Sequence, residues 1–106
     1  MATAPEDGAD VDKIGVDTAL YEAFARGFVT AIGDRMTAKE KELLPLSCLL
    51  MTYEVGIRFL TDYLSGDVYF RIGYPEHNLV RAQNQLTLTK RMEEALPEFY
   101  KITKAL

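Results

Sequence analysis

The sequence predicts an all-α fold, a small bundle of three main helices with one or two short ones. Between residues 17 and 33, apolar side chains recur every four residues, a spacing that gathers them on one side of a helix. The segment 46–63 is apolar on nearly all sides, as in a helix that has neighbours around it. A third helical pattern starts near residue 78. These three segments are expected to supply the main helices.

The chain is expected to begin with an arm that has little to bury. Its first residues, MATAPEDGADVD, contain proline, glycine and four acidic residues. That composition is typical of extended or disordered segments. We therefore divide the chain into an acidic arm over residues 1–14 and a helical domain over residues 15–106.

Local signals mark the ends of the first two helices. Asp17 or Thr18 can cap the start of the first helix, and Gly33 can end it. Thr37 and Glu40 form a capping-box pattern, which predicts a short second helix through residue 44. The apolar face of the first helix is expected to carry Leu20, Phe24, Phe28 and Ile32.

Proline and turn residues delimit the remaining elements. Pro45 fits the first turn of the central helix, and Gly66 breaks the helical pattern after it. Residues 68–72 are too short for a helix and lie between turns, so we expect a loop or a brief extended stretch. Asn78 is expected to be the N-cap of the last helix, and Pro97 is expected to kink or split that helix.

Bulk properties exclude several classes of function. A net charge of −4 and a pI near 4.9 argue against nucleic-acid binding, which requires clustered Lys and Arg. The longest apolar run, residues 43–51, is too short to span a membrane, and no signal peptide is visible. The single cysteine, Cys48, lies among leucines and is expected to be a core residue. A lone cysteine fits a reducing compartment, so we expect a cytoplasmic location.

Three charges interrupt the apolar central helix. Glu54, Arg58 and Asp62 follow one another at intervals of four residues and therefore share one side of the helix. One interpretation is an intrahelical ladder in which Arg58 pairs with both carboxylates. The other is that Arg58 extends from the helix to a polar ligand and is held by its acidic neighbours. Composition alone slightly favours the ladder.

Longer segments resemble a known family. The runs RFLTDYLSGDVYFRI, EHNLVRAQNQ and RMEE are similar to the C-terminal end of the aminoglycoside-phosphotransferase-like family. The similarity is to its N-acetylhexosamine kinase branch, whose members are often mislabelled mucin desulfatases. The resemblance extends from about residue 12 to residue 92. It implies the C-terminal helical part of a protein-kinase-like fold.

The resemblance also implies which residues bind substrate. In the sugar-kinase branch, the Arg of RFLTDYL and the Tyr of DVYF hydrogen-bond the hexose, and these positions are Arg58 and Tyr69 in this sequence. Asp62, Arg71 and His77 are weaker candidates that we do not assign as contacts.

No catalytic residue and no metal ligand is assigned in this chain. Phosphoryl transfer by such kinases needs a loop and Lys on the phosphates, a catalytic Asp and ligands for Mg²⁺. His77 is followed by Asn78 and Leu79, so the His-x-Asp of a catalytic loop is missing. The resemblance implies that the ATP and Mg²⁺ of the parent enzyme are handled by an upstream catalytic portion. That portion and the sugar would be the partners of this chain.

A second hypothesis comes from a different class. The chain could be a free-standing helical domain that works by protein association or oligomerisation. A helix apolar on nearly all sides needs more cover than three short neighbours supply. We therefore expect an exposed apolar face or a homodimer.

Overall fold

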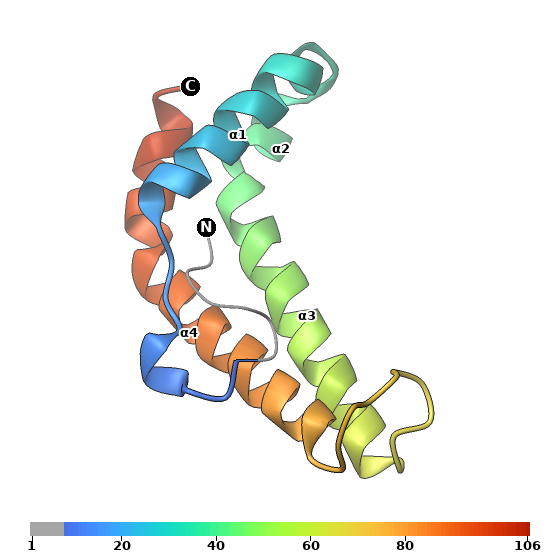
Figure 1. Cartoon of the computed structure of the whole chain (residues 1–106). Helices are drawn as coiled ribbons and strands as arrows, with labels where there is room; N and C mark the ends of the chain where they lie inside the picture. The colour runs from blue at the N-terminus through green and yellow to red at the C-terminus, as the bar shows by residue number, and fades with distance from the viewer. Residues whose placement is uncertain (1–7) are drawn as a thin grey trace.

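The computed structural model describes residues 8–106, which fold as helices and connecting loops (Figure 1). The described part of the chain is 76% helical and contains no strand, which confirms the all-α prediction. Its helices are α1 (Thr18–Ile32), α2 (Ala38–Glu42), α3 (Leu44–Leu64) and α4 (His77–Lys104). Single 3₁₀ turns, Val11–Lys13 and Gly33–Arg35, precede and follow α1.

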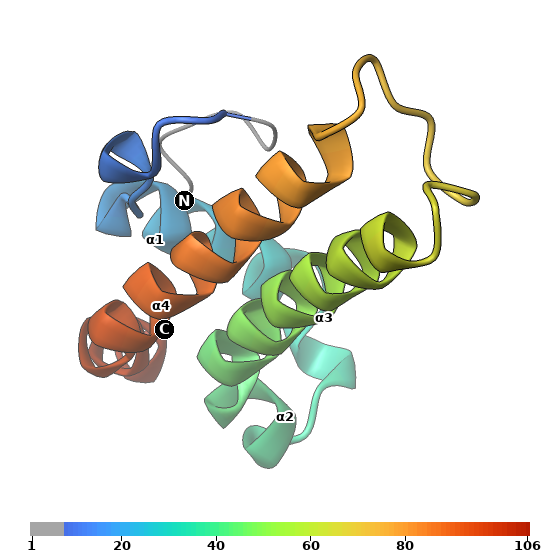
Figure 2. The same ribbon diagram turned by 90° about the horizontal axis from the view of Figure 1, so that it is seen from below.

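Helices α3 and α4 form an antiparallel hairpin that is the framework of the molecule. The loop 65–76 joins them at one end, and α1 lies across the other end (Figures 1 and 2). Gly56 of α3 allows the two helices to approach closely, because a Cβ added there would lie 3.0 Å from Cδ2 of Leu86 on α4. The short α2 lies at the N-terminal end of α3.

The hydrophobic core lies where α1 crosses the hairpin. The ring of Tyr21 stacks on that of Phe99 with centroids 4.1 Å apart, and both side chains are fully buried. The Tyr21 hydroxyl and Thr103 Oγ1 are 2.6 Å apart, so the buried phenol keeps a hydrogen-bond partner. The core cluster consists of Ile14, Tyr21, Ala25, Leu44, Leu88, Met92 and Phe99.

Most of the predicted helix signals are confirmed. Asp17 caps α1, with Oδ1 accepting from the backbone N–H of Ala19 at 2.8 Å. Thr37 and Glu40 form both hydrogen bonds of a capping box at the start of α2. Pro45 lies in the first turn of α3, which starts at Leu44, two residues earlier than expected.

The structure contradicts the predicted N-cap of α4 and one of the two alternatives predicted for Pro97. Asn78 is not the N-cap, because the helix starts at His77 after Glu76, and the Asn78 side chain turns to the preceding loop instead. Of the two alternatives expected for Pro97, a kink or a split, the split is excluded because the helix is continuous over 28 residues. Met92 and Phe99, on either side of this proline, are buried in the same core, and that packing offsets the hydrogen bond that the proline cannot donate.

The N-terminal arm is partly packed where the structure describes it. Residues 1–7 of the expected arm lie outside the described residues. After them, the Gly8 carbonyl accepts a 2.9 Å hydrogen bond from Asn84 Nδ2, and Ile14 is buried in the core. Packing of the chain therefore begins within the range expected for the arm.

The apolar residues of α1 and α3 are distributed differently from expectation. Leu20, Phe24 and Phe28 on α1 are each more than a third exposed, while Tyr21 and Ala25 make the core contacts. On α3 the apolar residues facing away from α4 are also exposed, among them Leu50 and Ile57. Exposed apolar surface was expected for this chain, and the structure contains it. No helix of the described residues is long and apolar enough to cross a membrane.

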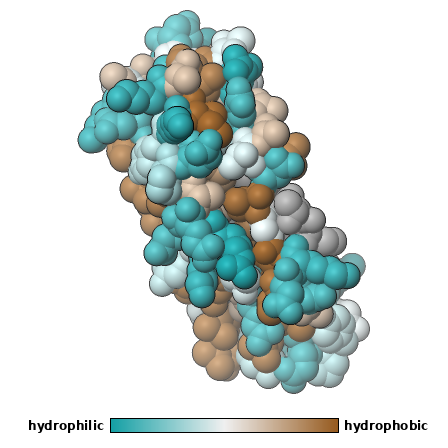
Figure 3. All heavy atoms as spheres, turned by 90° about the vertical axis from the view of Figure 1, so that its left-hand side faces the viewer, coloured by the Kyte–Doolittle hydropathy of each residue, from teal (hydrophilic) through white to brown (hydrophobic). Residues whose placement is uncertain are grey.

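The molecule is elongated for its length. Its radius of gyration is 15.4 Å and its extents are 45 × 27 × 18 Å, whereas a compact chain of this length has a radius of gyration of about 13 Å. The face on the α4 side is mostly hydrophilic, with separate apolar areas (Figure 3).

Replacing Phe99 with alanine tests the position of the core. Phe99→Ala should lower the free energy of unfolding by about 3–5 kcal/mol, because it leaves a cavity beneath Tyr21. The control Phe24→Ala removes a ring that is 42% exposed and should cost about 1 kcal/mol or less. Urea denaturation followed by circular dichroism measures both. Similar losses in the two variants would contradict the core described here.

Candidate functional site

The three charged residues of α3, Glu54, Arg58 and Asp62, have different environments. Arg58 Nη1 lies 3.9 Å from Glu54 Oε1, and both side chains are more than half exposed. Asp62, by contrast, is 5% exposed and is hydrogen-bonded to the loop that follows α3. The ladder interpretation is therefore half right, because Arg58 has one of its two expected acidic partners.

Asp62 holds the loop that carries Tyr69. Its Oδ1 accepts from the backbone N–H of Tyr69 at 2.8 Å, and its Oδ2 accepts from that of Phe70 at 3.0 Å. The backbone N–H of Asp67 donates to the Asp62 carbonyl at 2.8 Å. Gly66 and Asp67 both have positive φ, 95° and 60°, which turns the chain back toward α3. The loop is thus anchored on the last turn of α3.

Asn78 joins this anchor to α4. Its amide nitrogen donates to Asp62 Oδ2 at 2.8 Å and to Asp67 Oδ1 at 3.0 Å. Its oxygen accepts from Arg81 Nη1 at 3.1 Å, and the same guanidinium donates to the Arg71 carbonyl at 2.9 Å. Asn78 is fully buried, and every polar atom of its amide has a partner. Such satisfied buried networks specify one local geometry.

These hydrogen bonds lower the pKa of Asp62. Burial of the carboxylate opposes its ionisation, but donation from the backbone of Phe70, Tyr69 and Val68 and from Asn78 outweighs this effect. The pKa of Asp62 therefore lies below its usual value, and the ionised carboxylate is the form that holds the loop.

A second tie connects the two ends of the loop. The Tyr63 hydroxyl, at the end of α3, donates to Glu76 Oε2 at 3.2 Å, just before α4. The charge of the Glu76 carboxylate and this hydrogen bond raise the pKa of Tyr63. The loop is therefore closed at its ends as well as anchored in its middle.

The structure brings the two predicted substrate-binding residues together. The guanidinium carbon of Arg58 lies 5.9 Å from the centroid of the Tyr69 ring, within the range of a cation–π contact. Tyr69 is 73% exposed, because Asp62 binds the backbone of this residue and its side chain lies outside. Arg58 comes from a helix and Tyr69 from a loop, so the fold creates this contact.

A shallow pocket surrounds the pair. It has a volume of about 330 Å³, at the small end of the range for ligand pockets. Its lining residues are Arg58, Thr61, Asp62, Ser65, Val68, Tyr69 and Phe70. Guanidinium and hydroxyl groups beside an aromatic ring suit a polyhydroxylated ligand, since a sugar presents both hydroxyls and apolar C–H faces. The Asp62 carboxylate is occupied by the loop and by Asn78.

Aromatic rings support the floor of the pocket. Phe70 packs on Phe59 of α3 with centroids 4.7 Å apart and meets the Tyr69 ring edge-on at 4.9 Å. The guanidinium of Arg81 lies 5.5 Å from the Phe59 ring centroid on the α4 side. These contacts limit the movement of Tyr69 relative to Arg58.

His77 and Arg71 lie outside the pocket lining. His77 Nδ1 accepts from the backbone N–H of Gly73 at 3.0 Å, and its ring stacks on Tyr74. His77 therefore has a structural role at the start of α4. Arg71 contributes its carbonyl to the Arg81 hydrogen bond.

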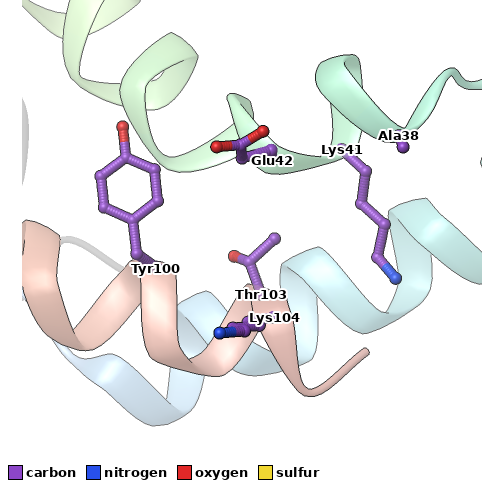
Figure 4. Close-up of a pocket in the computed structure, with 6 residues that line it drawn as sticks. All are labelled: Ala38, Lys41, Glu42, Tyr100, Thr103 and Lys104. Atoms are coloured by element: carbon purple, nitrogen blue, oxygen red, sulfur yellow. The ribbon is translucent and has the colours of Figure 1, made fainter.

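A larger pocket lies between α2 and the end of α4 (Figure 4). It has a volume of about 580 Å³ and is lined by Ala38, Lys41, Glu42, Tyr100, Thr103 and Lys104. The Thr103 hydroxyl is already bonded to Tyr21 and to the Phe99 carbonyl. The charged residues around it lie on exposed or half-exposed helix surfaces. This pocket therefore offers a ligand little beyond apolar contact.

Asn78 and Asp67 are the residues holding the candidate site that sequence reasoning missed. Asn78 was expected to cap a helix, and the partners of an N-cap side chain are backbone N–H groups two or three residues later. Its actual partners come from α3 and the loop. The sequence signal that could have indicated this is the adjacent Gly66 and Asp67, since both residue types tolerate the left-handed backbone of a tight turn.

The Asp62 anchor should make stability depend on pH in the acid range. A pKa lowered by folding means that its stabilisation is complete above the ordinary aspartate value of about 3.9 and is lost as pH falls through the lower folded-state value. Asp62→Asn should lower the melting temperature at neutral pH and flatten the acid limb of its pH profile. The control Asp34→Asn changes an exposed carboxylate of the turn after α1 and should leave the profile unchanged. Identical profiles for both variants and the wild type would contradict the role of Asp62.

Within residues 8–106, no group of three or more His, Cys, Asp or Glu side chains is arranged to hold a metal ion. The Cys48 thiol is partly buried against the core, and that burial raises its pKa, as expected for a packing residue. No family model matches the sequence. A functional assignment therefore depends on the geometry of the Arg58–Tyr69 pocket and on the resemblance of the segments that form it.

Proposed function

We propose that this chain is the C-terminal helical part of an ATP-dependent small-molecule kinase. In this role it supplies one wall of the pocket for the acceptor, an N-acetylhexosamine or a related sugar. The phosphates of ATP and their Mg²⁺ would be bound by an N-terminal catalytic portion, which is the main partner of this chain. A cytoplasmic location is part of the proposal, since ATP and a reduced Cys48 are both expected there.

The observation that supports this proposal best is the contact between Arg58 and Tyr69. The resemblance implied both residues as sugar contacts, and they line one pocket although they belong to different elements. Arg58 has one long ion pair, at 3.9 Å, and a half-exposed side chain, so its guanidinium can donate to an incoming hydroxyl. Tyr69 offers an exposed ring face and a hydroxyl.

The Asp62 anchor also supports the proposal. A binding site is effective when the groups that contact the ligand are held in position before it arrives. Asp62 accepts a hydrogen bond from the backbone N–H of Tyr69, and Asn78 in turn donates to Asp62. The Phe70 ring packs edge-on against the Tyr69 ring. These residues would position the sugar-binding pair without touching the sugar.

A second candidate function is association. The exposed apolar residues of α1 and α3, such as Phe24 and Ile57, are what an interaction domain would present to a partner. This function and the first are compatible, because the C-terminal part of a larger enzyme also needs an apolar face toward its remaining portion.

The first test concerns Arg58 in the complete enzyme. Arg58→Ala should cost roughly 1.5–3 kcal/mol of transition-state stabilisation, or about a 10- to 150-fold loss in kcat/KM for the sugar. Its effect on folding stability should be about 1 kcal/mol or less, since the Glu54 pair is exposed. Tyr69→Phe should reduce kcat/KM more weakly because it keeps the ring.

Arg26→Ala is the matched control for this test. Arg26 also pairs with a glutamate four residues earlier, Glu22, and is similarly exposed, but it lies on α1 away from the pocket. Steady-state kinetics with varied sugar should show wild-type values for this variant. If Arg58→Ala and Tyr69→Phe also showed wild-type sugar kinetics, neither residue would be a sugar contact.

The second test concerns the isolated chain. It should transfer no phosphate from ATP to any sugar, because the residues that bind the nucleotide are proposed to lie in another part of the enzyme. A coupled assay for ADP release, with a heat-inactivated control, measures this. Sustained sugar-dependent ADP release by the purified 106-residue chain would contradict the proposal that ATP is bound by another part of the enzyme.

A further inference from the structure

One side of α3 carries an apolar stripe with coiled-coil spacing. The intervals between its members alternate between four and three residues, which is the a/d pattern of heptads. Four members are exposed and two are half-buried. The stripe consists of Leu46, Leu50, Tyr53, Ile57, Leu60 and Leu64.

The stripe lies opposite the side of α3 that packs on α4. Gly56, Phe59 and Asp62 are the buried residues in the second half of α3, and they face the α4 helix and the loop. In Figure 2, only α2, at the N-terminal end, lies near the outer side of α3 among the described elements. A helix with coiled-coil spacing on an uncovered side is suited to receive another helix.

We propose that a second copy of this chain covers the stripe, with the two α3 helices antiparallel about a twofold axis. The axis would pass near the level of residue 55. This inference makes the association candidate specific for α3, because it names a second copy of the chain as the partner. It does not depend on the proposed kinase function, since neither a sugar nor a catalytic portion takes part in the contact.

The order of residues in the stripe matches an antiparallel copy of itself. In an antiparallel pair, each a position packs against a d position of the other helix. With the axis at residue 55, Leu50 faces the partner's Leu60, and Ile57 faces the partner's Tyr53. Leu64 in turn faces the partner's Leu46. Every layer is therefore apolar, and the contact is the same on both subunits, as a twofold interface requires.

Charges beside the stripe also match under this axis. Glu54 and Arg58 lie on one edge of the stripe, on the exposed side of α3. The antiparallel arrangement places Glu54 about 3 Å along the helix axis from the level of the partner's Arg58, since each residue rises about 1.5 Å. Two glutamates and two arginines then form a neutral group around the axis. Their pairing within one helix is long, at 3.9 Å, so the guanidinium retains donors for a second carboxylate.

The size of the contact suits a stable helix pair. From residue 46 to residue 64 the stripe extends over roughly 27 Å of α3, or about five helical turns. Covering it would also bury the most exposed side chain of the stripe, Leu64, which is 75% exposed in the single chain. Such burial is the main favourable term in association.

The test begins with sedimentation equilibrium of the complete chain without any sugar, from micromolar to millimolar concentration. The expected result is a reversible dimer. Ile57→Lys should abolish it, because the substitution puts a charge into the central layer. The control Phe24→Lys places the same charge on the exposed face of α1 and should leave the dimer intact. Circular dichroism should show that both variants remain folded, since both positions are about two-fifths exposed.

A charge exchange tests the antiparallel register. Glu54→Lys and Arg58→Glu should each weaken self-association by roughly tenfold or more, because like charges then face each other. An equal mixture of the two variants should form a heterodimer, since the new Lys at position 54 then faces the new Glu at position 58, and the remaining Arg58 faces the remaining Glu54. A monomeric wild-type chain, a dimer lost in Phe24→Lys but kept in Ile57→Lys, or a mixture that stays monomeric would each overturn the proposal. Sugar binding is not measured here, so a failed dimer leaves the Arg58–Tyr69 site to be judged by its own test.

Discussion

The hydrogen bonds of the Asp62 carboxylate are the interaction on which the loop end of this fold depends. A helical hairpin alone would leave the segment after α3 free to adopt many conformations. Asp62 removes that freedom by accepting two backbone N–H groups of the loop and one amide hydrogen of Asn78. Because Asn78 belongs to α4, a single buried carboxylate joins the two helices and the loop. The position of Tyr69 follows from this junction.

The two sides of α3 make different contacts. Its inner side provides Gly56 for close packing with α4 and Asp62 for the loop. Its outer side carries Arg58 at the edge of an uncovered apolar stripe. The segment 46–63 is apolar on nearly all sides, and under the proposed dimer each side would have a surface to cover it. In the single chain only one of these surfaces is covered, which agrees with the elongated shape of the molecule.

Features decided over a few residues could be predicted from the sequence, and features decided by distant contacts could not. The Asp17 cap, the Thr37 capping box and the loop after Gly66 were all predictable because their partners are sequence neighbours. Asn78 is buried because the loop after α3 brings the start of α4 back to Asp62. Hydrophobic periodicity does not reveal such a contact. The buried side of α1 was missed for a similar reason, because Tyr21 offers its hydroxyl to a threonine 82 residues away. At the site, Arg58 and Tyr69 were identified through resemblance, while their contact required the folded chain.

Amide hydrogen exchange at Tyr69 and Phe70 tests the central claim most directly. Loop amides exposed to water exchange rapidly, whereas amides bonded to a buried carboxylate exchange only when the structure opens. Our account predicts that these two amides exchange as slowly as those in the middle of α4 and that Asp62→Asn removes their protection. Rapid exchange at both positions in the wild-type protein, while α4 stays protected, would contradict it, because the loop would then have no fixed position for Tyr69 beside Arg58.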